Sequence, residues 1–180
     1  MDANRKYMNR EQLFKEVIGE NSQRIFRICN YYFSDPDDRN DAYQETLIRI
    51  WENLHSFKGN SKLSTWIYRV SVNACLSRIR SEKTRNGMIE TGTNPDILQV
   101  EEPSTEEEDH LEEYKTKFLL QFMLKLNTVD RTLVSLYLEE LSTREIAEIT
   151  GISETNVRVR IHRIKERIKN EWEEKQHGTG

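Results

Sequence analysis

Glycine, proline and cysteine are scarce in this sequence, and long apolar runs are missing. Seven glycines and three prolines in 180 residues are few for an all-β chain, which needs many tight turns. No apolar stretch approaches the roughly 20 residues that cross a bilayer. The first six residues contain no apolar core of the kind found in signal peptides. These absences favour a helical, cytoplasmic protein.

Cysteine and histidine, the residues most often found in metal and redox sites, are few in this sequence and scattered along it. The two cysteines, Cys29 and Cys75, lie inside apolar helical patterns, which favours buried free thiols over a redox or metal role. The four histidines show no metal-ligand spacing. No Ser/His/Asp set, metal cluster or phosphate-binding loop is present. The sequence therefore predicts no metal, no cofactor, no small-molecule substrate and no enzymatic activity.

Charge is distributed unevenly along the chain, although the net charge is only −4. Residues 1–85 carry a net charge of +4 and residues 114–180 a net charge of +2, whereas residues 86–113 contain ten acidic and no basic residues. The acidic segment has no helical or alternating period and contains Gly87, Gly92, Pro95 and Pro103. We interpret it as a flexible linker extended by its own repulsion, with a specific binding role as the alternative. Its neighbours, residues 1–85 and 114–175, are the expected domains.

Apolar residues recur at helical spacing on both sides of this linker. A turn at residues 34–38 separates the early helices from one that begins near Asn40 or Asp41. Trp66 begins the apolar stripe of a later helix, and at that spacing it is a core residue rather than a base contact. The predicted fold is all-α, with two small helical domains. The helix that begins near Asn40 or Asp41 has an apolar stripe formed by Leu47, Ile50, Trp51 and Leu54.

The sharpest local signal lies between residues 141 and 163. Ser142 and Glu145 form a capping box, Gly151 stands where the first helix ends, and Ser153 can cap a second helix. Ala147 is small where two helices must cross closely, and Val157 packs beneath the first helix. This spacing predicts a helix-turn-helix.

The second helix of this motif has a polar and basic outward face. Its first residues are suited to base edges and its cations to phosphates, so DNA binding is favoured over an ordinary helical hairpin with a solvated basic face. The candidate DNA-binding residues are Ser153, Thr155, Asn156, Arg158, Arg160, His162 and Arg163.

With these motifs in view, the C-terminal half resembles region 4 of bacterial sigma factors. The resemblance implies binding to the promoter −35 element and to the β-flap of RNA polymerase. Asn127 stands where the family often has proline, and Asn156 where it often has threonine; the latter could alter −35 preference because asparagine pairs well with adenine. The matching residues are Leu126, Arg131, Leu136, Leu141, Ser142, Glu145, Ile146, Ala147, Gly151, Ile152, Ser153, Val157 and Arg158.

The N-terminal half resembles region 2 of the same family. Residues 41–51 are similar to the helix that docks on the polymerase β′ clamp helices, and residues 57–73 to the segment that captures the melted −10 strand. The resemblance implies polymerase binding through Asp41, Gln44, Glu45 and Arg49. It implies −10 binding through Phe57, Asn60, Ser61, Lys62 and Asn73, to which we add Arg78 and Arg80, although cations there also suit the helix dipole.

Both halves occur in the expected order, and the absence of other modules of the family matches its compact extracytoplasmic-function group, so the chain is identified as a member of that group. The expected partners are core RNA polymerase, promoter DNA and an anti-sigma factor. The linker of this family threads toward the RNA-exit path, where its acidity could imitate nucleic acid. The alternative is an autonomous helix-turn-helix regulator, which would bind duplex DNA tightly without polymerase.

Overall fold

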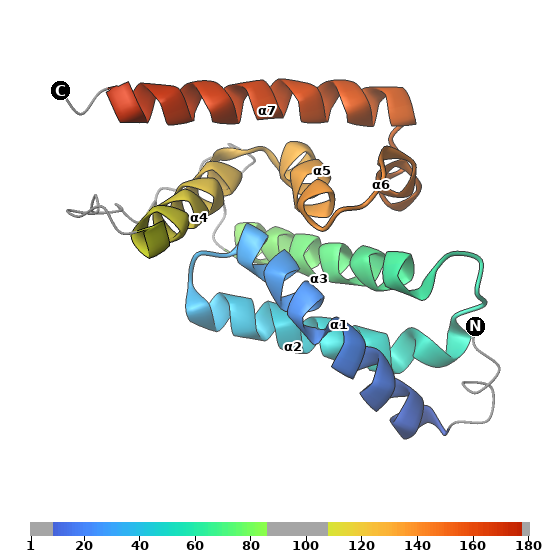
Figure 1. The fold of residues 1–180 in the computed structure, drawn as a ribbon. Coiled ribbons are helices and arrows are strands. Elements are labelled where there is room, and N and C mark those ends of the chain that lie inside the picture. Colours follow the sequence, from blue (N-terminus) through green and yellow to red (C-terminus); the bar gives the residue numbers. More distant parts are fainter. Residues whose placement is uncertain (1–8, 86–107, 178–180) are drawn as a thin grey trace. The chain divides into compact units, whose positions relative to one another are not determined.

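The computed structural model describes residues 9–85 and 108–177, and the regular elements among them are all helical. They divide into two compact units, one with α1–α3 and the other with α4–α7 (Figure 1). Within these described ranges, no helix is both long and apolar enough to cross a membrane. The helices are α1 (Arg10–Tyr32), α2 (Pro36–Asn53), the short 3₁₀ helix η2 (Leu54–Ser56), α3 (Leu63–Arg85), α4 (Glu108–Lys125), α5 (Thr128–Leu138), α6 (Thr143–Thr150) and α7 (Glu154–His177).

Side-chain caps determine where the first helices begin. Asn9 and Gln12 form a capping box at α1, with the Gln12 amide donating to the Asn9 Oδ1 over 2.8 Å. Asp35 caps α2 by accepting from two backbone amides, and Pro36 occupies the first turn, where its missing N–H costs nothing. The prediction that this helix begins near Asn40 was therefore wrong, since the cap lies inside the predicted turn.

The three long helices of the N-terminal unit pack around one apolar core. Val17, Ile25, Ile50, Leu54 and Ile67 are at most 2 % exposed and contact one another. Burial of an aliphatic side chain of this size contributes about 1.5–3 kcal/mol. This cluster helps to hold α2 and α3 in place, and these two helices carry residues expected to bind partners.

Both cysteines are free and fully buried in this unit, which confirms the interpretation as core thiols. A hydrogen bond with Cys29, together with burial, raises the pKa of Cys75 well above its ordinary value. Trp51 behaves differently from its prediction as a core residue. It is 36 % exposed, with its ring against the edge of Phe14 at 5.2 Å and the Arg10 guanidinium 4.3 Å from its centroid.

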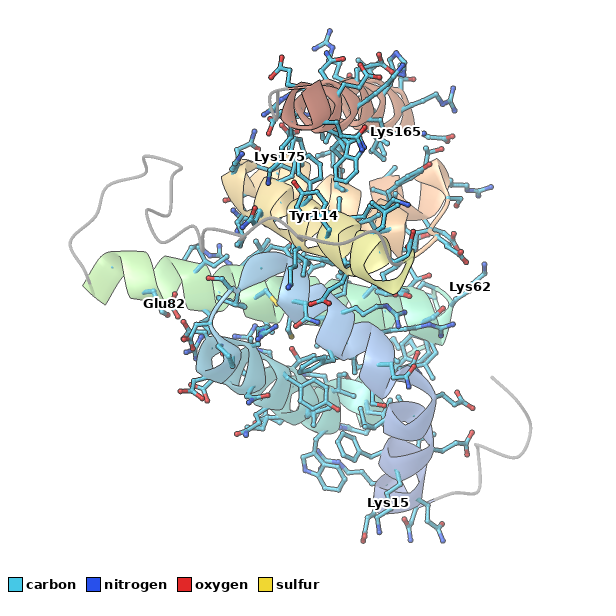
Figure 2. All side chains as sticks on the ribbon, turned by 60° about the vertical axis from the view of Figure 1, so that its left-hand side comes forward. Lys15, Lys62, Glu82, Tyr114, Lys165 and Lys175 are labelled. Atoms are coloured by element: carbon cyan, nitrogen blue, oxygen red, sulfur yellow. The ribbon has the colours of Figure 1, made fainter. Side chains whose placement is uncertain are left out.

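The C-terminal unit is organised along the long helix α7. Helix α6 lies against the first turns of α7, and α4 lies against its C-terminal half (Figure 1). An aromatic cluster joins α4 to α7, with Phe118 and Trp172 ring centroids 5.0 Å apart. The Lys175 ammonium lies 5.1 Å from the Tyr114 ring in the same cluster (Figure 2). These contacts hold α4 against the C-terminal part of α7.

Helix α4 begins at Glu108, so the last six residues assigned to the linker are helical rather than flexible. The remainder of the predicted linker, residues 86–107, lies outside the described residues.

Candidate nucleic-acid interface

The helix-turn-helix of α6 and α7 has the local geometry that its sequence predicts. The Glu145 amide donates to the Ser142 hydroxyl over 3.3 Å, and the Ser142 amide donates to the Glu145 carboxylate over 3.1 Å. Gly151 ends α6 with φ of +73°, in the left-handed region that glycine occupies without strain. The Asn156 amide is 3.4 Å from the Ser153 hydroxyl at the start of α7. The capping box and the turn glycine are thus confirmed.

An apolar seam fixes the angle between the two helices. Ile146 of α6 and Val157 of α7 are fully buried, and Ile161 and Ile164 continue the buried side of α7 with exposures of 5 % and 2 %. These positions repeat at three- and four-residue spacing, so one side of α7 is committed to the core. The opposite side is consequently presented outward.

Most of the residues predicted to bind DNA lie on that outward side of α7. Thr155, Asn156, His162 and Arg163 are exposed. Arg158 is also exposed and pairs with Glu154 over 3.0 Å, one turn earlier on the helix. Exposed pairs of this kind contribute at most about 1 kcal/mol, so a phosphate can displace the carboxylate at small cost.

Arg160 is placed differently from the other predicted contacts. Its Nε lies 2.9 Å from Asp130 of α5, and the Asp130 side chain is only 14 % exposed. The Asn127 amide donates to the same carboxylate over 2.8 Å. Arg160 therefore ties α7 to α5, a contact that no local sequence pattern reveals.

One apolar residue of the outward face was not among the residues predicted to bind DNA. Val159 is 42 % exposed, although the other valine of this helix, Val157, is fully buried. Its position two residues after a predicted core residue is the signal that places it outward, since that step turns about 200° around a helix.

The loop before α3 carries the first group of residues predicted to bind −10 DNA. Phe57 is half-buried and its ring centroid lies 5.5 Å from that of Trp66. Asn60 and Lys62 are exposed, and the Ser61 hydroxyl donates to the Lys62 carbonyl over 3.3 Å. Lys62 lies at the start of α3 (Figure 2). Trp66 packs partly buried against the apolar core, which confirms its assignment.

Helix α3 extends the polar surface away from this loop. Trp66, Asn73 and Arg80 are seven residues apart, a spacing that puts them on one side of the helix at steps of about 10 Å. Asn73 and Arg80 are exposed, and the Arg80 Nε donates to the Leu76 carbonyl over 3.2 Å. An aromatic pair, an amide and a cation therefore follow one another along α3.

Arg78 also lies on α3, but its guanidinium contacts three carboxylates of the same unit. Its guanidinium lies 2.6 Å from Asp38, 3.2 Å from Asp41 and 3.0 Å from Glu82. Partial burial lowers the pKa of Arg78, but the hydrogen bond to Asp38 and the charges of Asp38, Glu82 and Asp41 outweigh burial and raise the pKa above its ordinary value. Arg78 thus joins α3 to the acidic start of α2.

The residues predicted to bind polymerase lie along one stripe of α2. Gln44 is exposed, Glu45 forms an ion pair with Arg49, and Asp41 shares the guanidinium of Arg78. Ile48 lies in the same stripe and is 56 % exposed, the most exposed large apolar side chain in the part of the chain that the structure describes. It was not among the residues predicted to bind a partner, although it follows Gln44 by one helical turn.

Comparison with known proteins gives matches for both units. The family model described as Sigma-70 region 2 matches residues 17–85, and the model described as Sigma-70, region 4 matches residues 119–168. The ECF RNA polymerase sigma factor SigW of Bacillus subtilis is 29 % identical over 167 residues, which cover 89 % of each chain. The chain belongs to the extracytoplasmic-function group of sigma factors. Its role is therefore to direct RNA polymerase to promoters.

Other similarities extend over most of this sigma factor. The ECF RNA polymerase sigma-E factor of Haemophilus influenzae is 26 % identical over 166 residues, covering 89 % of this chain and 87 % of the relative. The solved structure of CnrH in complex with the cytosolic domain of CnrY has the same fold, with a TM-score of 0.64, 17 % identity and coverage of 95 % and 94 %. The sigma factor RpoE in complex with the anti-sigma factor NepR from Bartonella quintana has a TM-score of 0.63, with 18 % identity and coverage of 87 % of this chain and 96 % of RpoE.

Proposed function

We propose that this sigma factor recognises the −35 element by inserting the start of α7 into the major groove. The groove is about 12 Å wide and admits one helix. The outward face of α7 combines short polar side chains near its start with cations further along. Ser153, Thr155, Asn156, Arg158, His162 and Arg163 are the contacts that this geometry favours. Arg160 is the least suited of the predicted set, because DNA binding would separate it from Asp130.

The N-terminal unit, residues 1–85, would stabilise the melted −10 strand. A base can stack near the Phe57 and Trp66 pair, with about 1–3 kcal/mol per stacked base. The loop residues Asn60, Ser61 and Lys62 follow Phe57 in sequence, with Asn60 and Lys62 exposed and Ser61 partly buried, and Asn73 offers an amide further along α3. Of the two predicted arginines of α3, Arg80 is the better candidate for a phosphate contact. Arg78 is surrounded by three carboxylates, which favours a structural role for Arg78.

Core RNA polymerase would dock on the stripe of α2 that contains Asp41, Gln44, Glu45, Ile48 and Arg49. An exposed isoleucine with polar neighbours has the anatomy of an interface hot spot. By analogy with the family, the partner surface is the β′ clamp helices, and residues 114–175 would meet the β-flap. An anti-sigma factor is the expected regulator, since RpoE is bound by one in its solved structure. The protein itself would carry out no reaction and would act in the cytoplasm.

The proposal rests on one observation. The helix-turn-helix is capped as its sequence predicts, its inner side is buried, and its second helix, α7, presents a polar face outward. The first test is a titration of labelled protein with purified bacterial core RNA polymerase. We expect tight binding that weakens at least tenfold in Ile48→Asp, because a hot-spot change costs about 2 kcal/mol or more. Lys15→Asp places the same carboxylate at an exposed site of α1 and should leave binding unchanged.

The resulting holoenzyme is then tested on promoter DNA. We expect sequence-selective binding that requires both elements. Failure of the unchanged protein to bind core polymerase, together with tight binding to a duplex palindrome, would replace this proposal with an autonomous helix-turn-helix regulator.

A further inference from the structure

We infer that Val159 contacts the 5-methyl group of a thymine in the −35 element and so makes this sigma factor selective for one T·A pair. The inference rests on the proposed function of α7, and it adds an apolar contact to the polar recognition already proposed. It concerns a residue outside the set that the sequence pattern predicts to bind DNA.

The position of Val159 on α7 is the first argument. On a helix, the nearest surface neighbours of a residue are those three and four positions away. For Val159 these are Thr155, Asn156, His162 and Arg163, all of them exposed and all proposed to contact DNA. Val159 is therefore at the centre of the proposed interface and must face the bases if its neighbours do.

The second argument is its exposure. Val157, Ile161 and Ile164, which lie on the core side of α7, are at most 5 % exposed, whereas Val159 is 42 % exposed. Single exposed apolar residues are common on proteins, and exposure alone would carry no inference. Here the exposed valine has four exposed polar neighbours that are proposed to contact DNA, so contact of these neighbours with DNA would bury the valine as well.

Base chemistry identifies the ligand. In the major groove the edges of the four base pairs present hydrogen-bond donors and acceptors, and the thymine 5-methyl is the only apolar group. A valine side chain can neither donate nor accept a hydrogen bond. Because valine is held largely in one rotamer in a helix, its two methyl groups are presented at a fixed place. Thymine is thus the base whose edge the side chain complements.

The experiment removes the methyl group from DNA and from the protein separately. Holoenzyme first selects its preferred duplex from a library randomised across the −35 element. Each thymine of that duplex is then replaced singly by deoxyuridine, which lacks only the 5-methyl group, and the affinity is measured. We expect one replacement to weaken binding about fourfold, the equivalent of about 0.8 kcal/mol for one buried methyl group.

The same replacements are repeated with three variants. In Val159→Ala the sensitive position should lose its response to deoxyuridine, whereas Val159→Ile should keep it. Val129→Ala is the matched control, since Val129 is 41 % exposed but lies on α5, and its pattern should equal that of the unchanged protein. The inference is overturned if no deoxyuridine weakens binding, or if the response persists in Val159→Ala. A holoenzyme that selects no −35 sequence would instead refute the proposed function of α7.

Discussion

Replacement of Arg78 should destabilise the N-terminal unit without weakening its binding to DNA. The change considered is Arg78→Gln, which keeps a polar side chain of moderate length but removes the positive charge. In the native protein this charge is shared by Asp38, Asp41 and Glu82. Its removal leaves three carboxylates close together, so the loss of attraction and the new repulsion act in the same direction.

The size of the effect follows from how exposed each partner is. The Arg78 side chain is 20 % exposed, and its partners Glu82, Asp38 and Asp41 are 29 %, 41 % and 58 % exposed. Water screens the last two pairs, which contribute about 0.2–1 kcal/mol each, while the less exposed pair with Glu82 contributes about 1 kcal/mol. We expect a loss of about 2 kcal/mol in the free energy of unfolding. For a unit of this size that lowers the Tm by about 10 °C.

The assay must report on this unit alone. Trp51 and Trp66 belong to it, so a Trp172→Phe background removes the tryptophan of the other unit and lets fluorescence follow unfolding in urea or heat. Arg80→Gln is the matched control on the same helix and should leave the Tm nearly unchanged.

Binding to single strands of the −10 element should respond to Arg80→Gln and not to Arg78→Gln, which is the reverse of the effect on the Tm. Because Arg80→Gln removes a cation that we propose to bind one phosphate, it should reduce the slope of log K against log salt by about 0.7. Arg78→Gln, measured well below its Tm, should keep the slope of the unchanged protein. Equal thermal stability of the two variants, or a reduced slope in Arg78→Gln alone, would show that the assignment of these two arginines is wrong.

Three further outcomes are expected from other parts of the molecule. Gly151→Ala should destabilise the C-terminal unit by about 1 kcal/mol in urea unfolding, because φ of +73° strains an alanine although open space surrounds the added Cβ; Gly151→Asn should cost less. Asp130→Asn should lower stability by about 0.5–1 kcal/mol, measured in the same way, since it breaks the pair with Arg160. The raised pKa of Cys75 means that the unfolded thiol ionises first, so urea midpoints of the N-terminal unit should fall as pH rises above about 8.5, and Cys75→Ala should remove this part of the pH dependence.

The helix-turn-helix was predictable from sequence because each of its signals is local. The capping box joins residues three apart, the turn glycine acts through its own φ angle, and the buried seam follows the helical period. The same reason explains why the all-α fold class was predicted correctly for the described residues. Burial of both cysteines followed from the apolar pattern around them.

Contacts between elements distant in sequence were not predictable in this way. Arg78 reaches Asp38 across 40 positions, and Arg160 reaches Asp130 across 30. A count of cations on a helix face cannot distinguish an arginine that is available to DNA from one that already has a carboxylate. Trp51 was misplaced for a related reason, since a place at the edge of an apolar stripe does not show whether another helix covers it.

The three arginines of α7 that were predicted to bind DNA differ in the interactions that each must lose before it can bind a phosphate. Among the residues that the structure describes, Arg163 has no carboxylate partner, so a phosphate costs it only hydration. Arg158 must leave Glu154, but that pair is exposed and worth at most about 1 kcal/mol. Arg160 would leave Asp130 nearly buried and without its cation, and an uncompensated buried charge is far more costly. Phosphate contacts on this helix should therefore follow the order Arg163, Arg158 and Arg160, which is not their order along the chain.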